Sequence, residues 1–223
     1  MQAGNVTYAT ADDLPETVGL FPLSGALLLP GGNLPLNIFE PRYLALIDEA
    51  MRDDRVIGMI QPALDAPEDQ DNPPLCTVGC LGRISAFQET GDGRLMVNLS
   101  GICRFRLDGE SEERSGYRRA RFKPFVEDLG DMSEAEAEVD RDALLETFKQ
   151  FLQANDLEAD WEGVSEASTE TLVNSLSMMS PYGPAEKQAL LEAGDLKIRA
   201  ETLIAITEIA LAREAGDATG TLQ

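Results

Sequence analysis

The sequence predicts an α+β protein with a β-rich first half, which contains one helix, and a small helical bundle in the second half. Short apolar runs separated by turn signals fill the first half, as in a small barrel or sandwich. Beyond residue 132, apolar side chains recur with the 3.6-residue period of amphipathic helices. We therefore expect a β domain over 14–126 and a helical bundle over 132–215, with flexible tails at 1–13 and 216–223.

The elements of the β domain follow from its apolar runs and the breaks between them. Pro30-Gly31-Gly32 interrupts the first runs, and Pro41 suits the first turn of a helix over 41–53. Gly79 and Gly82 lie inside a long apolar run, where they indicate the bends that close a small barrel. Further strands are expected at 56–60, 75–87, 95–100, 102–107 and 117–125. The side chains expected in the β-domain core include Phe21, Leu36, Ile38 and Phe39.

The second half contains the start and stop signals of four helices. Ser133-Glu134-Ala135-Glu136 is a capping box that opens a helix reaching about residue 154. Gly183-Pro184 opens a short third helix, and Asp195 caps a last helix over 196–213. The second helix has one apolar face, formed by Leu172, Leu176 and Met179. Short connections between such helices are typical of a bundle.

Composition excludes several classes of function. The formal net charge of −22 repels nucleic-acid phosphates and anionic lipids. The absence of histidine excludes Ser-His-Asp and Cys-His catalysis and every His-containing zinc site within this sequence. Cys76, Cys80 and Cys103 lack the fourth thiol of a zinc site, so we interpret them as buried, reduced thiols and expect no metal. The N-terminus lacks the features of a secretory signal, so a cytoplasmic location is expected.

A set of motifs between residues 20 and 44 resembles the opening of the N-terminal, substrate-binding domain of the Lon protease family. The motifs are Phe21-Pro22-Leu23, Pro30-Gly31, Leu34-Pro35-Leu36 and Ile38-Phe39-Glu40-Pro41-Arg42-Tyr43. The resemblance extends over about 17–214 and includes 79–83, 92–94, 99–101, 104–105, 187–192 and Arg199. It implies that the β domain is a PUA-like pseudobarrel.

The same resemblance implies a function without catalysis. A domain of this family would recognise polypeptide, in particular unfolded or degradation-bound segments, as an adaptor or holdase linked to a protease or chaperone in protein quality control. The sequence contains no Gly-x-x-x-x-Gly-Lys-Ser/Thr phosphate loop, and it ends soon after the last helix. We therefore expect a stand-alone domain without ATPase or peptidase modules, enzymatic activity or a cofactor.

An apolar groove between the β domain and the bundle would hold an extended peptide through backbone hydrogen bonds and side-chain pockets. The residues that we interpret as polypeptide-binding are Phe39, Tyr43, Met178, Met179 and Tyr182. Packing in the core is the competing interpretation of the same side chains, because methionine and aromatic residues at helical spacing fill cores as readily as they form grooves.

The alternative function is an RNA- or ribosome-associated binding module, since PUA-like folds elsewhere bind RNA. The sequence has one basic cluster, over Arg114–Lys123, in which Arg119, Arg121 and Lys123 share a strand face. Few aromatic residues that would stack on bases are interleaved with it. Its charges could instead pair with acidic residues, which abound in this chain.

Overall fold

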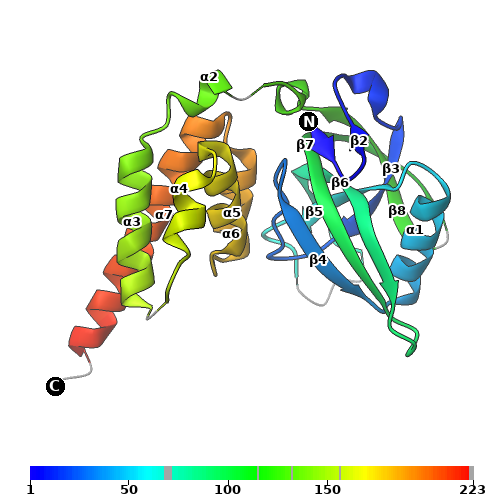
Figure 1. The fold of residues 1–223 in the computed structure, drawn as a ribbon. Helices are drawn as coiled ribbons and strands as arrows, with labels where there is room; N and C mark the ends of the chain where they lie inside the picture. Colours follow the sequence, from blue (N-terminus) through cyan, green and yellow to red (C-terminus); the bar gives the residue numbers. More distant parts are fainter. Residues whose placement is uncertain (68–71, 115, 132, 156, 221–223) are drawn as a thin grey trace.

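The computed structural model describes residues 1–67, 72–114, 116–131, 133–155 and 157–220, without the side chains of 112–114 and 214–220. A mixed β-sheet forms the first half of the chain and helices form the second (Figure 1). The α+β class expected from the change of apolar period is therefore confirmed.

Six strands of the first half form one sheet in the order β4-β7-β6-β5-β3-β8, and β7 also pairs with β8. This second pairing closes the sheet into a barrel. Only β3 and β5 run parallel among the pairs of this sheet. The strands are β3 (Thr17–Pro22), β4 (Asn33–Ile38), β5 (Val56–Pro62), β6 (Leu75–Glu89), β7 (Leu95–Arg114) and β8 (Tyr117–Pro124). Helix α1 (Pro41–Arg52) packs on β3 and β8.

The two glycines predicted to bend β6 have different roles. The register between β6 and β7 shifts between Leu81 and Gly82, which is the expected irregularity. Gly79 instead leaves space for Phe105, because a Cβ atom there would lie 2.6 Å from the phenyl ring. Phe105 is completely buried, so the missing side chain at Gly79 admits this phenyl ring into the barrel interior.

The first thirteen residues, expected to be a flexible tail, are packed against the barrel. They form β1 (Gln2–Ala3), β2 (Val6–Thr7) and the short 3-10 helix η1 (Ala11–Asp13). Ala3 and Tyr8 are buried in the same apolar cluster as the barrel interior. The Met1 ammonium group donates to the carbonyl oxygens of Tyr8 and Leu129. Two isolated buried residues leave no long periodic apolar run in the sequence, so the pattern predicted a tail where the structure has a packed segment.

The second half contains helices α2 (Ser133–Glu136), α3 (Arg141–Ala154), α4 (Trp161–Glu166), α5 (Thr169–Met179), α6 (Pro184–Glu192) and α7 (Leu196–Gly220). The single helix expected from 133 to 154 is divided, because Asp140 caps a new helix by accepting from the Ala143 N–H. Helix α4 was not expected from the sequence. Asp195 caps α7 as predicted, since its carboxylate accepts from the Ile198 N–H. Helix α7 continues into the expected C-terminal tail as far as Gly220.

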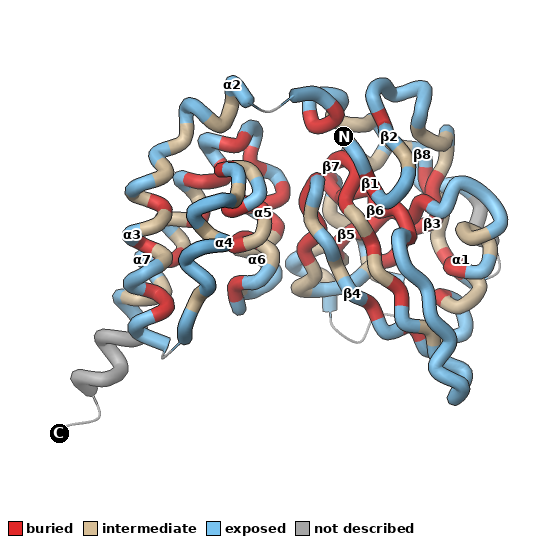
Figure 2. Tube along the Cα trace, viewed as in Figure 1, coloured by how far each residue is buried: buried red, intermediate tan, exposed pale blue. Residues whose placement is uncertain are grey.

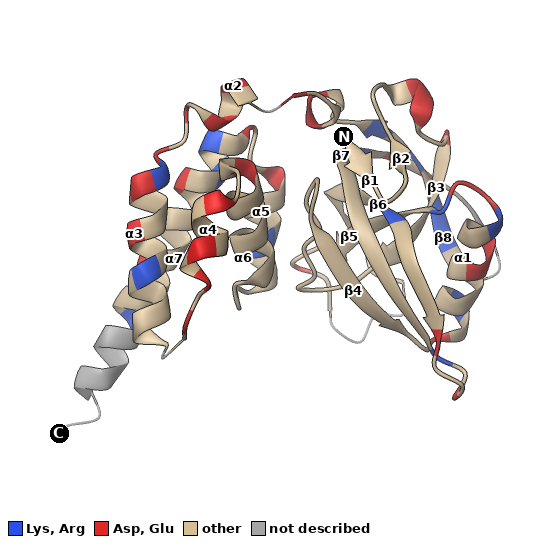
Figure 3. Ribbon diagram, in the orientation of Figure 1, with Lys and Arg blue, Asp and Glu red and all other residues tan. Residues whose placement is uncertain are grey.

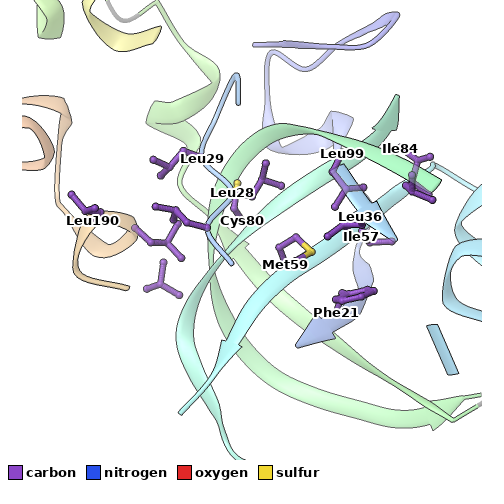
Figure 4. Close-up of a cluster of buried hydrophobic side chains, with 14 of the residues drawn as sticks. Phe21, Leu28, Leu29, Leu36, Ile57, Met59, Cys80, Ile84, Leu99 and Leu190 are labelled. Atoms are coloured by element: carbon purple, nitrogen blue, oxygen red, sulfur yellow. The ribbon is translucent and has the colours of Figure 1, made fainter. Parts of the chain in front are cut away.

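Buried residues occur in both halves of the chain (Figure 2), and one hydrophobic cluster has members from both halves. Leu190 of α6 lies beside Leu28 and Leu29, which precede β4, and near Cys80 of β6 (Figure 4). Two glutamine side chains add polar contacts across the same junction. Gln61 donates to the carbonyl oxygen of Pro184 over 2.9 Å, and Gln188 donates to that of Val78 over 3.2 Å. Because the core is continuous, the division into two domains stays a prediction.

A buried ion pair joins the barrel to the end of α6. Arg104 of β7 is 2% exposed, and its Nε and Nη2 each donate to the Asp128 carboxylate over 2.8 Å. Asp128 belongs to the 3-10 helix η2 (Val126–Leu129). The Arg104 Nη1 donates to the carbonyl oxygens of Leu191 and Ala193. Burial opposes the charge of Arg104, but the hydrogen bonds and charge of Asp128 raise its pKa overall.

A second buried guanidinium, that of Arg199 on α7, lies on the helical side of the junction. Its Nη1 donates to the Asn174 side chain over 3.1 Å, and its Nε donates to the Leu190 carbonyl over 3.0 Å. Asn174 in turn donates to the carbonyl oxygen of Pro30 over 3.0 Å. Burial, reinforced by the nearby positive charge of Arg104, lowers the pKa of Arg199 to about 10. Both guanidinium groups thus belong to one network across the junction.

Three of the four side chains expected in the β-domain core are buried: Phe21, Leu36 and Ile38. The expectation for Phe39 is wrong, because this residue is 60% exposed. Consecutive side chains in an extended chain point to opposite sides, so burial of Ile38 directs Phe39 outward. Met179 likewise differs from Leu172 and Leu176. It is 82% exposed and is the last residue of α5.

We expect Asp128→Ala to reduce the free energy of unfolding by about 3–5 kcal/mol, because it leaves the Arg104 charge buried without its partner. The double variant Arg104→Met/Asp128→Leu should recover most of this loss, since no charge then remains to be desolvated. Urea unfolding of the parent chain, Asp128→Ala and the double variant gives the three free energies of unfolding to be compared. A cost below about 1 kcal/mol for Asp128→Ala would contradict this assignment.

Phe21→Ala should reduce the free energy of unfolding by about 3–5 kcal/mol, because it creates a cavity beneath Tyr43. Phe39→Ala should change it by no more than about 0.5 kcal/mol, because the side chain is exposed. The two variants remove the same atoms, so each serves as the control of the other. Equal shifts of the urea midpoint would show that exposure does not distinguish the two positions.

Candidate functional site

A groove of about 540 Å³ lies between α1 and the projecting end of the β6–β7 hairpin. We call it the α1–hairpin groove. Its walls are mainly apolar, with one acidic side chain from each side. The lining residues are Leu44, Ala45, Asp48, Met51, Phe87, Glu89 and Leu95. An apolar surface of this kind takes up apolar side chains rather than positioning reactive groups.

The groove forms because α1 has two apolar faces. Its first face buries Tyr43, Leu46 and Ile47 in the core. On the second face, Leu44 and Met51 remain partly exposed toward the hairpin. Pro41 at the first helical turn sets where α1 begins and therefore which side chains each face presents.

The opposite wall is the distal part of the β6–β7 hairpin. Pairing of Phe87 with Val97 and of Glu89 with Leu95 places these side chains on one face of the hairpin. The turn is closed by a hydrogen bond from the Thr90 N–H to the Arg94 carbonyl oxygen. Gly91 and Gly93 within the turn have φ of +80° and +84°, which favour glycine. The predicted turn chemistry thus fixes the register that brings Phe87 and Leu95 together.

Two further exposed apolar side chains near the hairpin, Phe39 and Met96, do not line the groove. Phe39 follows Ile38, which pairs with Leu95, and the Arg94 guanidinium carbon lies 5.8 Å from the centre of the Phe39 ring. Phe87 and Met96 are each 41% exposed. The acid in the α1 wall is paired, since Asp48 forms an ion pair with Arg52 over 2.6 Å. The surface is therefore apolar with little uncompensated charge on the α1 side.

The remaining predicted polypeptide-binding residues lie elsewhere. Tyr43 is buried and stacks on Phe21, with ring centres 4.1 Å apart. The Tyr182 hydroxyl forms a 2.6 Å hydrogen bond with Thr207 inside the bundle. Met178 packs against Gly32 at the junction, and Met179 is exposed. Strand β4 separates Gly32 from Phe39 by about 20 Å of extended chain, so the five residues do not form one surface. Their role in binding stays a prediction.

The groove residues were visible in the sequence only as parts of apolar faces. Leu44 and Met51 share the helical spacing of core residues, and Phe87 and Leu95 belong to strands of apolar alternation. Their exposure depends on how far the hairpin projects past α1, which local periodicity does not encode. Phe39, the exposed residue that the sequence singled out, does not line this groove.

The basic cluster that suggested RNA binding is largely paired with acids. Arg118 donates to Glu110 over 2.6 Å, Arg119 to Glu49 over 3.0 Å, and Lys123 to Asp108 over 3.1 Å. Arg121 is exposed, and the side chain of Arg114 lies outside the described residues. Compensated charges attract phosphates less strongly than free ones. This arrangement matches the pairing alternative considered for the cluster.

The three cysteines are free thiols. Cys80 and Cys103 are buried and Cys76 is half-buried. Burial raises the pKa of all three, that of Cys103 to about 12. Among the described residues there is no group of three or more His, Cys, Asp or Glu side chains that could hold a metal ion. Within the same part of the chain, every helix is too short or too polar to cross a bilayer.

Comparison with known proteins places these features in a family. The model of the ATP-dependent protease La (LON) substrate-binding domain matches residues 17–208, so the chain belongs to this family. Lon protease 2 of Myxococcus xanthus is 29% identical over 196 residues, which are 86% of this chain and 24% of the relative. The Lon protease of Parabacteroides distasonis is 30% identical over 204 residues, with the same coverage. The chain thus spans about a quarter of the length of these relatives.

Two solved structures share the fold. The Lon N-terminal domain protein from Xanthomonas campestris has a TM-score of 0.60 and 24% identity, covering 85% of this chain and 97% of its own. The N-terminal domain of Mycobacterium avium complex Lon protease has a TM-score of 0.60 and 20% identity, covering 86% and 98%. The family resemblance noted in the opening motifs is confirmed.

Cys76 should be the first thiol of the native chain to react with a thiol-specific reagent at about pH 8, because the thiolate is the reactive form. A raised pKa lowers the thiolate fraction at any given pH, and burial further protects Cys80 and Cys103. All three thiols should react after unfolding in urea. Rapid modification of two or more thiols in the native protein would contradict the burial of Cys80 and Cys103.

Proposed function

We propose that this chain is a non-catalytic polypeptide-recognition module in which the α1–hairpin groove receives apolar side chains of unfolded or degradation-bound segments. Membership of the Lon substrate-binding family supports the class of function. The observation that carries the choice of surface is the open groove with the 41% exposed Phe87 in its wall. Action as an adaptor or holdase that presents clients to a protease or chaperone in the cytoplasm is part of the proposal.

The apolar walls suit weak and repeated binding. Full burial of one Leu or Phe side chain contributes about 1.5–3 kcal/mol. One or two such side chains only partly offset the loss of translational and chain entropy on association. Such an interaction releases its client readily and tolerates many sequences, because apolar burial has no directional requirement.

The filled junction supports this choice of surface over the groove first expected there. Leu28, Leu29 and Leu190 occupy the space between the two halves, and the Arg104 network lies beside them. Binding at the junction would require these contacts to separate. Binding at the α1–hairpin groove requires no change in the core.

The proposal is tested by titrating the chain with a reduced, alkylated model protein that carries a fluorescent label. Phe87→Ser and Met51→Ser, both in the lining, should each weaken binding by about fivefold or more, since about 1 kcal/mol of apolar burial is lost. Ile209→Ser is the matched control, because Ile209 is a 52% exposed apolar residue on α7, away from the groove. Affinity should change little with added salt.

Unchanged affinity in both groove variants, with urea midpoints like that of the parent chain, would contradict the assignment of the groove. The same titration with mixed RNA tests the alternative function. RNA binding through Arg119, Arg121 and Lys123 would weaken steeply with salt and would be lost in Arg121→Ala. RNA binding of that kind without polypeptide binding would overturn the proposed function.

A further inference from the structure

A second groove, of about 480 Å³, lies on the helical half between the C-terminal part of α3 and the segment leading into α4. We call it the α3–α4 groove. Its lining residues are Lys149, Leu152, Gln153, Leu157, Glu158, Ala159 and Trp161. Leu152 is buried, whereas Leu157 is 55% exposed and Trp161, the one tryptophan of the chain, is 42% exposed. Large apolar side chains that converge on an open groove indicate a contact surface.

Local hydrogen bonds hold the walls of this groove in place. The Leu157 N–H donates to the Leu152 carbonyl oxygen over 2.9 Å, which fixes the chain as it leaves α3. Asp160 caps α4 by accepting from the Gly163 N–H over 3.2 Å, which positions Trp161 at the first helical turn. The Lys149 ammonium lies 5.4 Å from the centre of the Trp161 ring. The exposed ring therefore already accepts a cation on its face.

The charged side chains around the α3–α4 groove indicate which kind of partner it would bind. The groove lining holds one base, Lys149, and one acid, Glu158, while Asp160 and Glu162 flank Trp161, so acids outnumber the lysine around the ring. Glu158 lines the groove, and Glu162 follows Trp161. Within the described part of the chain, neither of these two side chains forms an ion pair. In Figure 3, α4 and the segment before it carry acidic residues, whereas α3 carries both basic and acidic ones.

We propose that the α3–α4 groove binds a basic, amphipathic segment of a partner polypeptide, with a large apolar side chain against Trp161 and Leu157 and a flanking Lys or Arg beside Glu158 and Glu162. The basic cluster of a second copy of this chain is an unsuitable occupant, because Arg118, Arg119 and Lys123 are already paired within the barrel. The occupant is therefore a different polypeptide, and the site is independent of the α1–hairpin groove.

The intact chain tests this proposal directly, because Trp161 is its only tryptophan and reports on the groove. The probe is a short synthetic peptide of Leu and Lys without aromatic residues. It should shift the tryptophan emission to shorter wavelength with saturation. Matched peptides in which Glu replaces Lys, or Ser replaces Leu, should bind at least about tenfold more weakly, since each loses one of the two attractions. Added salt should weaken binding of the Leu/Lys peptide.

Variants separate specific binding from general attraction to an acidic protein. Glu158→Gln/Glu162→Gln and Leu157→Ser should each weaken binding by about fivefold or more. Glu201→Gln/Glu208→Gln removes the same charge from α7 and should have little effect, and so should Phe87→Ser in the other groove. Equal weakening by the α7 pair, no change in emission, or an emission shift that depends on chain concentration without peptide would overturn the proposal.

Discussion

The buried ion pair of Arg104 and Asp128 is the contact on which the arrangement of the molecule depends. Removing two charges from water is costly, and only close pairing with further hydrogen bonds offsets that cost. Asp128 accepts from the Arg104 N–H, Nε and Nη2, each over 2.8 Å. The remaining Arg104 nitrogen donates to carbonyl oxygens at the end of α6, where the helix dipole favours a positive charge. The Arg104 side chain thereby links the barrel to the helices, together with the shared hydrophobic cluster and the hydrogen bonds of Gln61, Gln188 and Asn174.

This constraint explains why the open surfaces lie away from the junction. Apolar side chains fill the space around the ion pair, and the Arg199–Asn174–Pro30 chain of hydrogen bonds closes it further. The grooves form instead where an element projects beyond the core. The β6–β7 hairpin projects past α1, and the segment after α3 projects past the bundle. Both surfaces are held by local turns and caps, so they exist without rearrangement of the core.

The two grooves differ in electrostatics, which separates the partners that suit them. At the α1–hairpin groove, Asp48 is compensated by Arg52, and apolar burial is the main attraction. At the α3–α4 groove, Glu158 and Glu162 form no ion pair among the described residues and outnumber the one lysine, Lys149, beside the tryptophan. The first suits varied unfolded segments and the second suits a segment with basic residues. The net charge of −22 therefore attracts a basic segment most strongly where acidic side chains outnumber their basic neighbours.

The sequence by itself determined the class of the fold, the family, and most helix and strand starts, because apolar period, caps and turn glycines act over a few residues. Pro41, Asp195 and the Gly91–Gly93 turn are such local signals. Only the tertiary structure decided which apolar side chains remain exposed. Phe39 and Met179 lie at the ends of elements, where burial depends on chain segments far away in sequence. The two grooves and the packing of residues 1–13 could not be predicted either, because each depends on contacts between segments that are distant in sequence.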